Sequence, residues 1–178
     1  MSQPPRPPYA GNPYARLFPA AAPAYRYAGW GRRVAATLID GVLGLAASVP
    51  LIAGYAWVLA SLEIRTDGNT GGTSSQYTGG PGPVVLVALG VLVTLAFWIW
   101  NTCVRQGRTG ATLGKSHLGI RVVKESTGRP IGAGQTFVRC LAHYVDSLVC
   151  YLGWLWPLWD EKRQTIGDKI MSTVVVRD

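Results

Sequence analysis

The chain has 178 residues and a formal net charge of +8, with 17 basic residues against 9 acidic ones. Apolar residues make up 48% of it and charged residues only 15%, below the ~25% of an average soluble protein. This balance argues against an ordinary soluble domain and favours a membrane protein with basic loops beside an anionic leaflet. Basic and aromatic residues are not interleaved, so no nucleic-acid partner is expected.

The residue types that bind metals or form covalent intermediates are few and widely spaced. Cys103, Cys140 and Cys150 lie in apolar segments without a C-x-x-C pair, which is typical of small membrane hydrophobes. His117 and His143 lack metal-ligand spacing, and no Ser-His-Asp or Cys-His arrangement is present. The sequence therefore predicts no metal, no cofactor and no enzymatic activity.

The N-terminal part divides into a tail and a long apolar segment. Residues 1–28 are rich in proline, tyrosine and alanine, which predicts a disordered tail. A membrane domain over 29–178 follows. Its residues 34–62 carry a single charge, Asp40, and are long enough to cross a bilayer, which needs ~20 apolar residues.

Two kinds of residue are expected to shape this first helix. Pro50 lies in its middle and should kink it. Small residues let membrane helices approach closely, which predicts packing contacts at Gly41, Gly44 and Gly54.

The next three segments set the orientation. Residues 63–83 are rich in Gly, Ser and Thr and predict a flexible outer loop, and 84–104 form a second uncharged spanning helix. Residues 105–135 carry six basic residues against one acid. The positive-inside rule places the tail and this basic loop in the cytoplasm, at the inner membrane of a cell.

The sequence also predicts a small cytoplasmic patch resembling a β-hairpin. Gly119–Lys124 alternates apolar and polar residues, and Thr173–Arg177 is a β-branched run. We expect the two to pair, which puts the C-terminal segment 160–178 in the cytoplasm as well. Within it, residues 160–171 predict a short amphipathic helix or turn.

Residues 136–159 admit two interpretations. Their length suits a third span, but a single crossing would separate the two paired strands. The preferred alternative is an interfacial helix followed by a shallow re-entrant turn near residues 153–157, covered by protein. The predicted fold class is thus an α-helical integral membrane protein with two transmembrane helices and a third membrane-embedded or interfacial segment.

A repeated charge pattern marks the first and third apolar segments. Asp40 lies seven positions after Arg33, and Asp146 lies seven positions after Arg139, both in the pattern R-x-x-A-x-x-x-D. This spacing puts each pair on one helix face, ~10.5 Å apart along the axis, too far for an ideal contact. A carboxylate in a membrane requires a partner, so the sequence predicts cross-pairs of Arg139 with Asp40 and of Arg33 with Asp146.

Residues 110–116, GATLGKS, fall one residue short of a phosphate-binding loop and follow a membrane helix rather than a strand. The preferred interpretation is a turn with Lys115 on anionic lipid headgroups. His143, three residues before Asp146, is predicted to be an interface histidine, with a proton relay as the alternative.

Three stretches together resemble the RDD family of small bacterial membrane proteins, named for an arginine and two aspartates. They are the Arg33…Asp40 helix start, GRTGATLGKSHLGIRVV and KRQTIGDKIMSTVVV. The resemblance implies that Arg33 and Asp40 are the family's arginine and first aspartate. It places the second aspartate at Asp168, with Asp146 as the alternative. Some members have been linked to sodium/proton antiport.

Two functions remain open. The first is an accessory or scaffold protein that holds partners at the membrane, as a homo-oligomer or with another membrane protein. The second is a cation/proton transporter that acts as an oligomer, with Asp40 as the titrating group, because an intramembrane carboxylate is a functional candidate.

Overall fold

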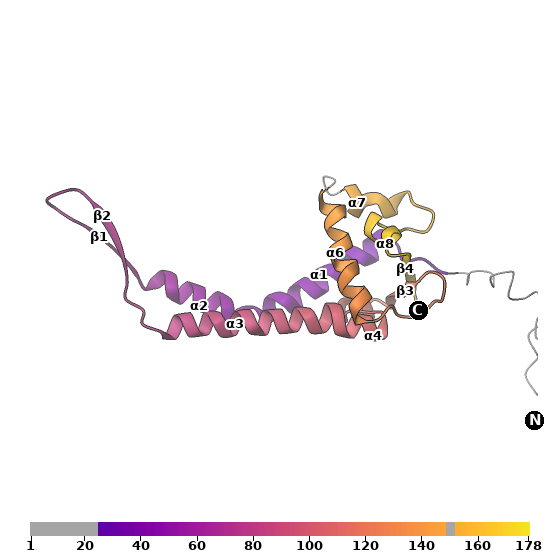
Figure 1. Ribbon diagram of the computed structural model, residues 1–178, viewed down its shortest axis with the longest axis horizontal. Coiled ribbons are helices and arrows are strands. Elements are labelled where there is room, and N and C mark those ends of the chain that lie inside the picture. Colours follow the sequence, from indigo (N-terminus) through magenta and orange to yellow (C-terminus); the bar gives the residue numbers. More distant parts are fainter. Residues whose placement is uncertain (1–24, 149–151) are drawn as a thin grey trace, which may run out of the picture.

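The computed structural model describes residues 25–148 and 152–178. It consists of a long two-helix arm with a hairpin at its far end and a mixed head at its near end (Figure 1). Most of the predicted tail and Cys150 lie outside the described residues.

The first half of the arm is a bent helix. It comprises α1 (Trp30–Ala47) and α2 (Val49–Ala60), which meet at Ser48 with a bend of 52°. Pro50 lies in the first turn of α2, where it has no N–H to donate a backbone hydrogen bond to the preceding turn. The predicted kink is confirmed.

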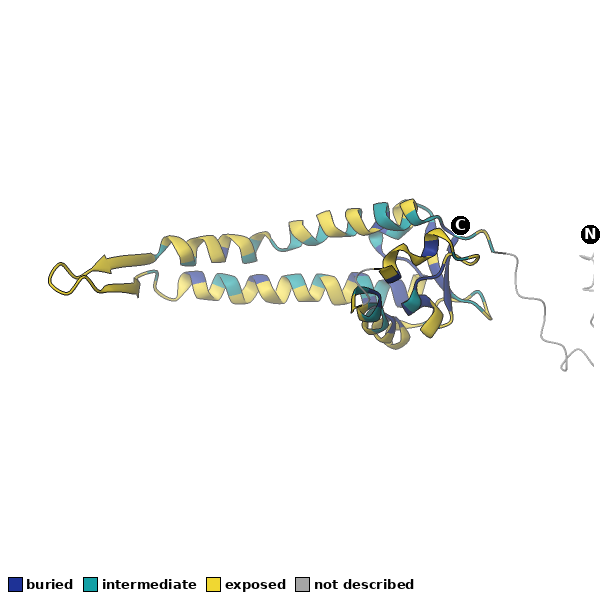
Figure 2. Ribbon diagram, turned by 90° about the horizontal axis from the view of Figure 1, so that it is seen from above, coloured by how far each residue is buried: buried dark blue, intermediate teal, exposed yellow. Residues whose placement is uncertain are grey.

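The second half of the arm is one continuous helix, Gly82–Thr109. It is built from α3 (Gly82–Trp98), the π-helical segment η1 (Ile99–Arg105) and α4 (Gln106–Thr109), so it ends five residues later than predicted. It is long and apolar enough to cross a bilayer, and the bent pair α1–α2 meets the same test if it forms one span. Only 11% of the most apolar stretch of the Gly82–Thr109 helix is buried, and Figure 2 shows the arm as largely exposed.

At the far end of the arm, residues 63–83 contain most of a β-hairpin where a flexible loop was predicted. β1 (Leu62–Thr66) and β2 (Thr73–Tyr77) form an antiparallel hairpin, with Ile64 opposite Ser75. Asp67 closes its turn by accepting hydrogen bonds from Asn69 N and Thr70 Oγ1. The Gly/Ser/Thr composition concealed this hairpin because both strands are fully exposed and β2 carries no apolar alternation.

The head contains the predicted strand pair. β3 (Ile120–Lys124) pairs antiparallel with β4 (Thr173–Arg177), and Val122 lies opposite Val175. The pairing buries β-branched side chains on both faces of the sheet. The predicted tail boundary at residue 28 is wrong, because Tyr27 bridges Val176 and Ala28 N donates to Val175 O.

The remaining helices surround this sheet. The short α5 (Leu113–His117) packs on α1, and α6 (Ala133–Leu148) contacts α8 (Ile166–Ile170). In Figure 1, α6 runs across the end of the arm rather than along it. The chain then folds back through α7 (Leu152–Leu155) and η2 (Trp156–Leu158), and Gly153 lies against Asp146.

Glycine decides how closely the two halves of the arm approach. A Cβ on Gly54 would lie 2.8 Å from Val87, and one on Gly90 would lie 2.3 Å from Leu51 N, so these are close-packing positions. The prediction holds for Gly54 and is wrong for Gly41 and Gly44, whose Cβ positions have no described heavy atom within 4 Å.

We expect Gly90→Ala to destabilise the arm by about 1–3 kcal/mol, because a methyl group would overlap the backbone of Leu51. Thermal unfolding in mild detergent measures this loss. Gly41→Ala is the matched control, since it has open space and gains helix propensity. Equal melting temperatures for the two variants would contradict the close approach.

Candidate functional site

Two arginines from different helices meet on one buried aspartate at the base of the arm. Arg33 of α1 donates from Nη1 to Asp168 Oδ2 at 2.7 Å. Arg139 of α6 donates to Asp168 Oδ1 from Nε at 2.9 Å and from Nη2 at 2.5 Å. Asp168 is 0% exposed, so both pairs lie in a desolvated environment. This cluster joins the first helix, the third apolar segment and the C-terminal segment.

These contacts correct the predicted cross-pairs. Arg139 does not bind Asp40, and Arg33 does not bind Asp146; both arginines bind Asp168. The seven-residue spacing predicts only the helix face on which each charged side chain lies. Which carboxylate pairs with each arginine depends on how the helices pack in the fold. Asp168 was predicted on a surface helix or turn and is instead buried in the head.

Local structure fixes the Asp168 carboxylate in place. Thr165 and Asp168 form a reciprocal cap at the start of α8, in which Asp168 N donates to Thr165 Oγ1 and Thr165 N donates to Asp168 Oδ2. Thr173 of β4 donates a further hydrogen bond to Oδ1 at 3.2 Å. Burial alone would raise the pKa of Asp168, but the charges of Arg139 and Arg33 hold it well below its usual range.

Asp40 has three neutral hydrogen-bond donors. Asn101 Nδ2 and Gly114 N each donate to Oδ1 at 2.9 Å, and Thr112 Oγ1 donates to Oδ2 at 2.6 Å. Asn101 also accepts from Leu113 N, so one amide bridges the carboxylate and the loop before α5. A Cβ on Gly114 would lie 2.1 Å from Ala36 O, which explains why glycine stands there. The cost of placing Asp40 in the arm is offset by these donors.

Asp146 interacts within its own turn and with α8. His143 Nδ1 lies 2.6 Å from Asp146 Oδ2, and Gly167 N donates to the carboxylate at 3.2 and 3.3 Å. His143 also stacks on Trp154 of α7, and its side chain is 13% exposed. Burial and the charge of Arg139 lower the pKa of His143, although Asp146 and Asp168 oppose this shift.

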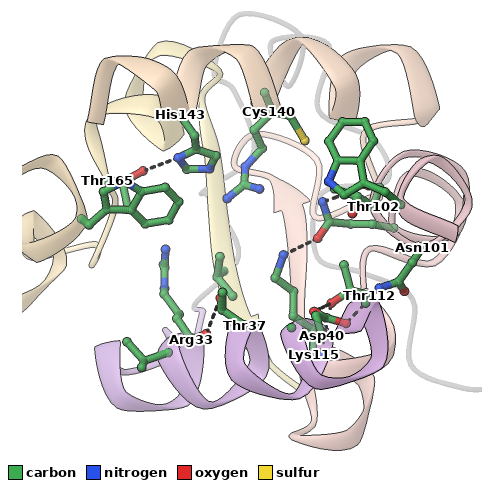
Figure 3. A pocket seen from close by; sticks show the side chains of 18 of the residues that line it. Arg33, Thr37, Asp40, Asn101, Thr102, Thr112, Lys115, Cys140, His143 and Thr165 are labelled. Atoms are coloured by element: carbon green, nitrogen blue, oxygen red, sulfur yellow. Dashed lines mark hydrogen bonds between the residues drawn. The ribbon is translucent and has the colours of Figure 1, made fainter. Parts of the chain in front are cut away.

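The glycine-rich stretch before β3 forms a turn and the short helix α5 instead of a phosphate-binding loop. Thr112 caps α5 by accepting from Lys115 N, and Lys115 Nζ points inward to Gln106 Oε1 (Figure 3). Lys115 therefore points into the interior at the base of the arm and not outward from the turn. Burial and the charges of Arg139 and Arg33 lower the pKa of Lys115 to about 7, against the opposite effects of Asp40 and Asp168.

The lowered pKa of Lys115 predicts that the free energy of unfolding rises with pH. Lys115 binds its proton less tightly in the folded state, so unfolding takes up a proton between about pH 7 and the ordinary lysine pKa near 10.4. The free energy of unfolding should increase by at most about 1.4 kcal/mol per pH unit over this range. Melting curves at successive pH values measure the slope.

Lys115→Met should remove this contribution to the slope, and Lys124→Met on β3 is the matched control. Lys124 donates to Met171 O at the sheet, away from the Lys115 side chain. The same pH slope in wild type and Lys115→Met would show that Lys115 does not titrate in this range.

The sequence interpretation identified the charged residues but missed the neutral groups that hold them. These are Asn101, Gln106, Thr112, Gly114 and Thr165. Asn101 is 2% exposed and lies in the π-helical segment η1 of the long helix. A single amide in an uncharged apolar run, with a carboxylate on the neighbouring helix, was the available signal.

Among the residues that the structure describes, no group of three or more His, Cys, Asp or Glu side chains is arranged to hold a metal ion. The site is instead a set of paired charges and hydrogen bonds that connects the arm to the head. An apolar arm joined in this way to a polar head defines a small α-helical membrane protein.

The chain belongs to the RDD family, which matches residues 27–172. This match confirms the resemblance found in the sequence, and the family is one of membrane proteins.

Two mycobacterial relatives are similar to the chain. It is 41% identical over 162 residues to the proline-rich antigen homolog of Mycobacterium tuberculosis, covering 86% of this chain and 65% of the relative. It is 52% identical over 83 residues to the proline-rich antigen of Mycobacterium leprae, covering 47% of this chain and 33% of that relative. The chain thus spans 65% or less of the length of these relatives. No solved structure matches it.

Proposed function

We propose that the protein is an accessory protein of the inner membrane that holds a protein partner beside its cytoplasmic head. The observation that carries this proposal is the contrast between an exposed apolar arm and a polar head, in which Arg33 and Arg139 are held by the buried Asp168. A long apolar arm of this kind anchors the chain in a bilayer.

In the proposed topology both halves of the arm cross the bilayer and the β1–β2 hairpin lies outside. The basic segment 105–135 belongs to the head, which the positive-inside rule assigns to the cytoplasm together with the N-terminal tail. Because α6 runs across the arm, it would lie along the inner interface instead of crossing. The pairing of β3 with β4 supports a cytoplasmic C-terminal segment.

Cysteine labelling in intact cells tests this topology. A version with Ser at positions 103, 140 and 150 would receive either Ser75→Cys in the hairpin or Thr127→Cys in the head. A membrane-impermeant maleimide should label the first variant in intact cells and the second only after lysis. Labelling of Thr127→Cys in intact cells would contradict the orientation.

Cation/proton transport is the second candidate, because Asp40 faces a cavity at the base of the arm. Three hydrogen bonds fix this carboxylate, and the two helices of the arm enclose no passage by themselves, which favours the accessory function. Cation-driven proton flux in proteoliposomes, with wild type beside Asp40→Asn, separates the two. The accessory proposal expects no flux from folded protein and a stoichiometric partner after purification. Flux that Asp40→Asn abolishes would support transport instead.

A further inference from the structure

A cavity of about 1060 Å³ lies where α1, α3 and α6 meet. Its lining comes from both halves of the arm and from the head, so it opens along the junction between the apolar and polar parts of the molecule. Figure 3 shows polar side chains that point into it from opposite walls. Neither the paired-charge cluster nor the proposed accessory function accounts for this space.

The head end of the cavity is rich in cationic donors. Arg33, Lys115 and Arg139 line it, and Asp40 is the only carboxylate that lines it among the described residues. Asp40 already accepts three hydrogen bonds, and the fully buried Asp168 shares one negative charge between two arginines. The wall therefore presents an excess of positive charge.

Arg33 has donors that its protein partners leave unused. Its Nη1 binds Asp168, but Nε and Nη2 are buried and have no hydrogen-bond partner among the described residues. Buried guanidinium donors without an acceptor are costly, and a phosphate or carboxylate oxygen would satisfy them. This unused capacity indicates an anionic ligand.

The other end of the cavity is apolar and extends along the arm. Its walls are Gly41, Gly44 and Leu45 of α1 and Phe97 and Trp98 of α3. The lining continues on α1 from Arg33 to Ser48, which corresponds to about 22 Å of helix. Because the Cβ positions of Gly41 and Gly44 are open, these glycines leave a groove beside the helix. A free inorganic anion would leave this groove unfilled.

We propose that this cavity binds one anionic phospholipid, with its phosphate at Arg33, Lys115 and Arg139 and an acyl chain in the groove between α1 and α3. Charge complementarity selects the headgroup, and the apolar groove selects a lipid over free phosphate. The site is a specific one, distinct from the lipids that surround the exposed faces of the arm.

Thermal unfolding of the full chain in a neutral detergent tests the binding. Phosphatidylglycerol should raise the melting temperature in a saturable manner, whereas phosphatidylcholine and inorganic phosphate at the same concentration should have no effect. Equal stabilisation by inorganic phosphate would show a free-anion site and overturn the lipid assignment. Equal stabilisation by phosphatidylcholine, or none by phosphatidylglycerol, would overturn the proposal.

Variants at two glycines of the same helix test the groove. Gly44→Leu fills it without touching a charge, and Gly31→Leu makes the same change at an exposed position of α1 that does not line the cavity. We expect Gly44→Leu to lose the response to phosphatidylglycerol and Gly31→Leu to keep it. An unchanged response in Gly44→Leu would mean that the stabilisation comes from surrounding lipid.

A third variant, Lys115→Gln, tests the headgroup contact. Loss of one charge-assisted contact to the phosphate should weaken phosphatidylglycerol binding about ten-fold or more. Native mass spectrometry of protein titrated with phosphatidylglycerol measures the bound fraction directly and reports on the folded molecules alone. Unaltered binding by Lys115→Gln would remove Lys115 from the site and overturn the proposed headgroup position.

Discussion

Asp168→Asn should be among the most destabilising single substitutions in this chain, with a loss of about 3–5 kcal/mol in the free energy of unfolding. The amide keeps the shape of the side chain but leaves Arg33 and Arg139 as two buried positive charges without a counter-charge. Denaturant or thermal unfolding in mild detergent measures the effect, and the yield of monodisperse protein should fall with it.

An exposed pair provides the control for this prediction. Asp178 lies 2.8 Å from Arg121, and both side chains are about half exposed. Asp178→Asn should therefore cost at most about 1 kcal/mol, as for other surface pairs. A similar small loss for Asp168→Asn would show that the cluster contributes little.

The stabilisation by Asp168 is present above the unfolded aspartate pKa near 4 and is lost as the pH falls further, because its folded pKa is lowered.

Asp40→Ala should cost about 2–4 kcal/mol and lower the folded yield. The substitution removes the acceptor for Asn101, Thr112 and Gly114 together, so the loop before α5 loses its attachment to α1. Asp40→Asn should cost less, since the amide retains one acceptor oxygen. Thermal unfolding of the two variants beside wild type gives the order.

Thr37→Ala on the same helix is the control for the Asp40 series. Its hydroxyl donates only to the backbone oxygen of Arg33 and is exposed, so little change is expected. If Asp40→Ala and Thr37→Ala unfold at the same temperature, the three hydrogen bonds at Asp40 do not hold the loop in place.

The features predicted from the sequence are those encoded by local patterns. The Thr173–Arg177 strand and its partner were recognisable because runs of β-branched residues favour a sheet wherever they can pair. The first helix and its kink followed from a long apolar run with a single charge, interrupted by Pro50. Each of these inferences needs only neighbours along the chain.

The features that were predicted wrongly depend on distant residues. Helix periodicity placed Arg33 and Arg139 on defined faces, but it contains no information on which carboxylate meets them. Gly44 has the same local appearance as Gly54, yet one borders a groove and the other contacts Val87, because α1 diverges from α3 and α2 does not. The inward direction of Lys115 was not predicted either, because the local sequence does not indicate that Gln106 is its partner.

The separation of Arg33 from Asp168 affects how the protein is made. The two residues are 135 positions apart, so at ~5–20 residues per second the ribosome reaches Asp168 roughly 7–27 s after Arg33. During this interval the first helix leaves the ribosome, but Asp168, the carboxylate that pairs with Arg33, has not yet been synthesised. The arm must therefore enter the bilayer before the head can close, and the nascent protein has to keep Arg33 hydrated until the end of translation.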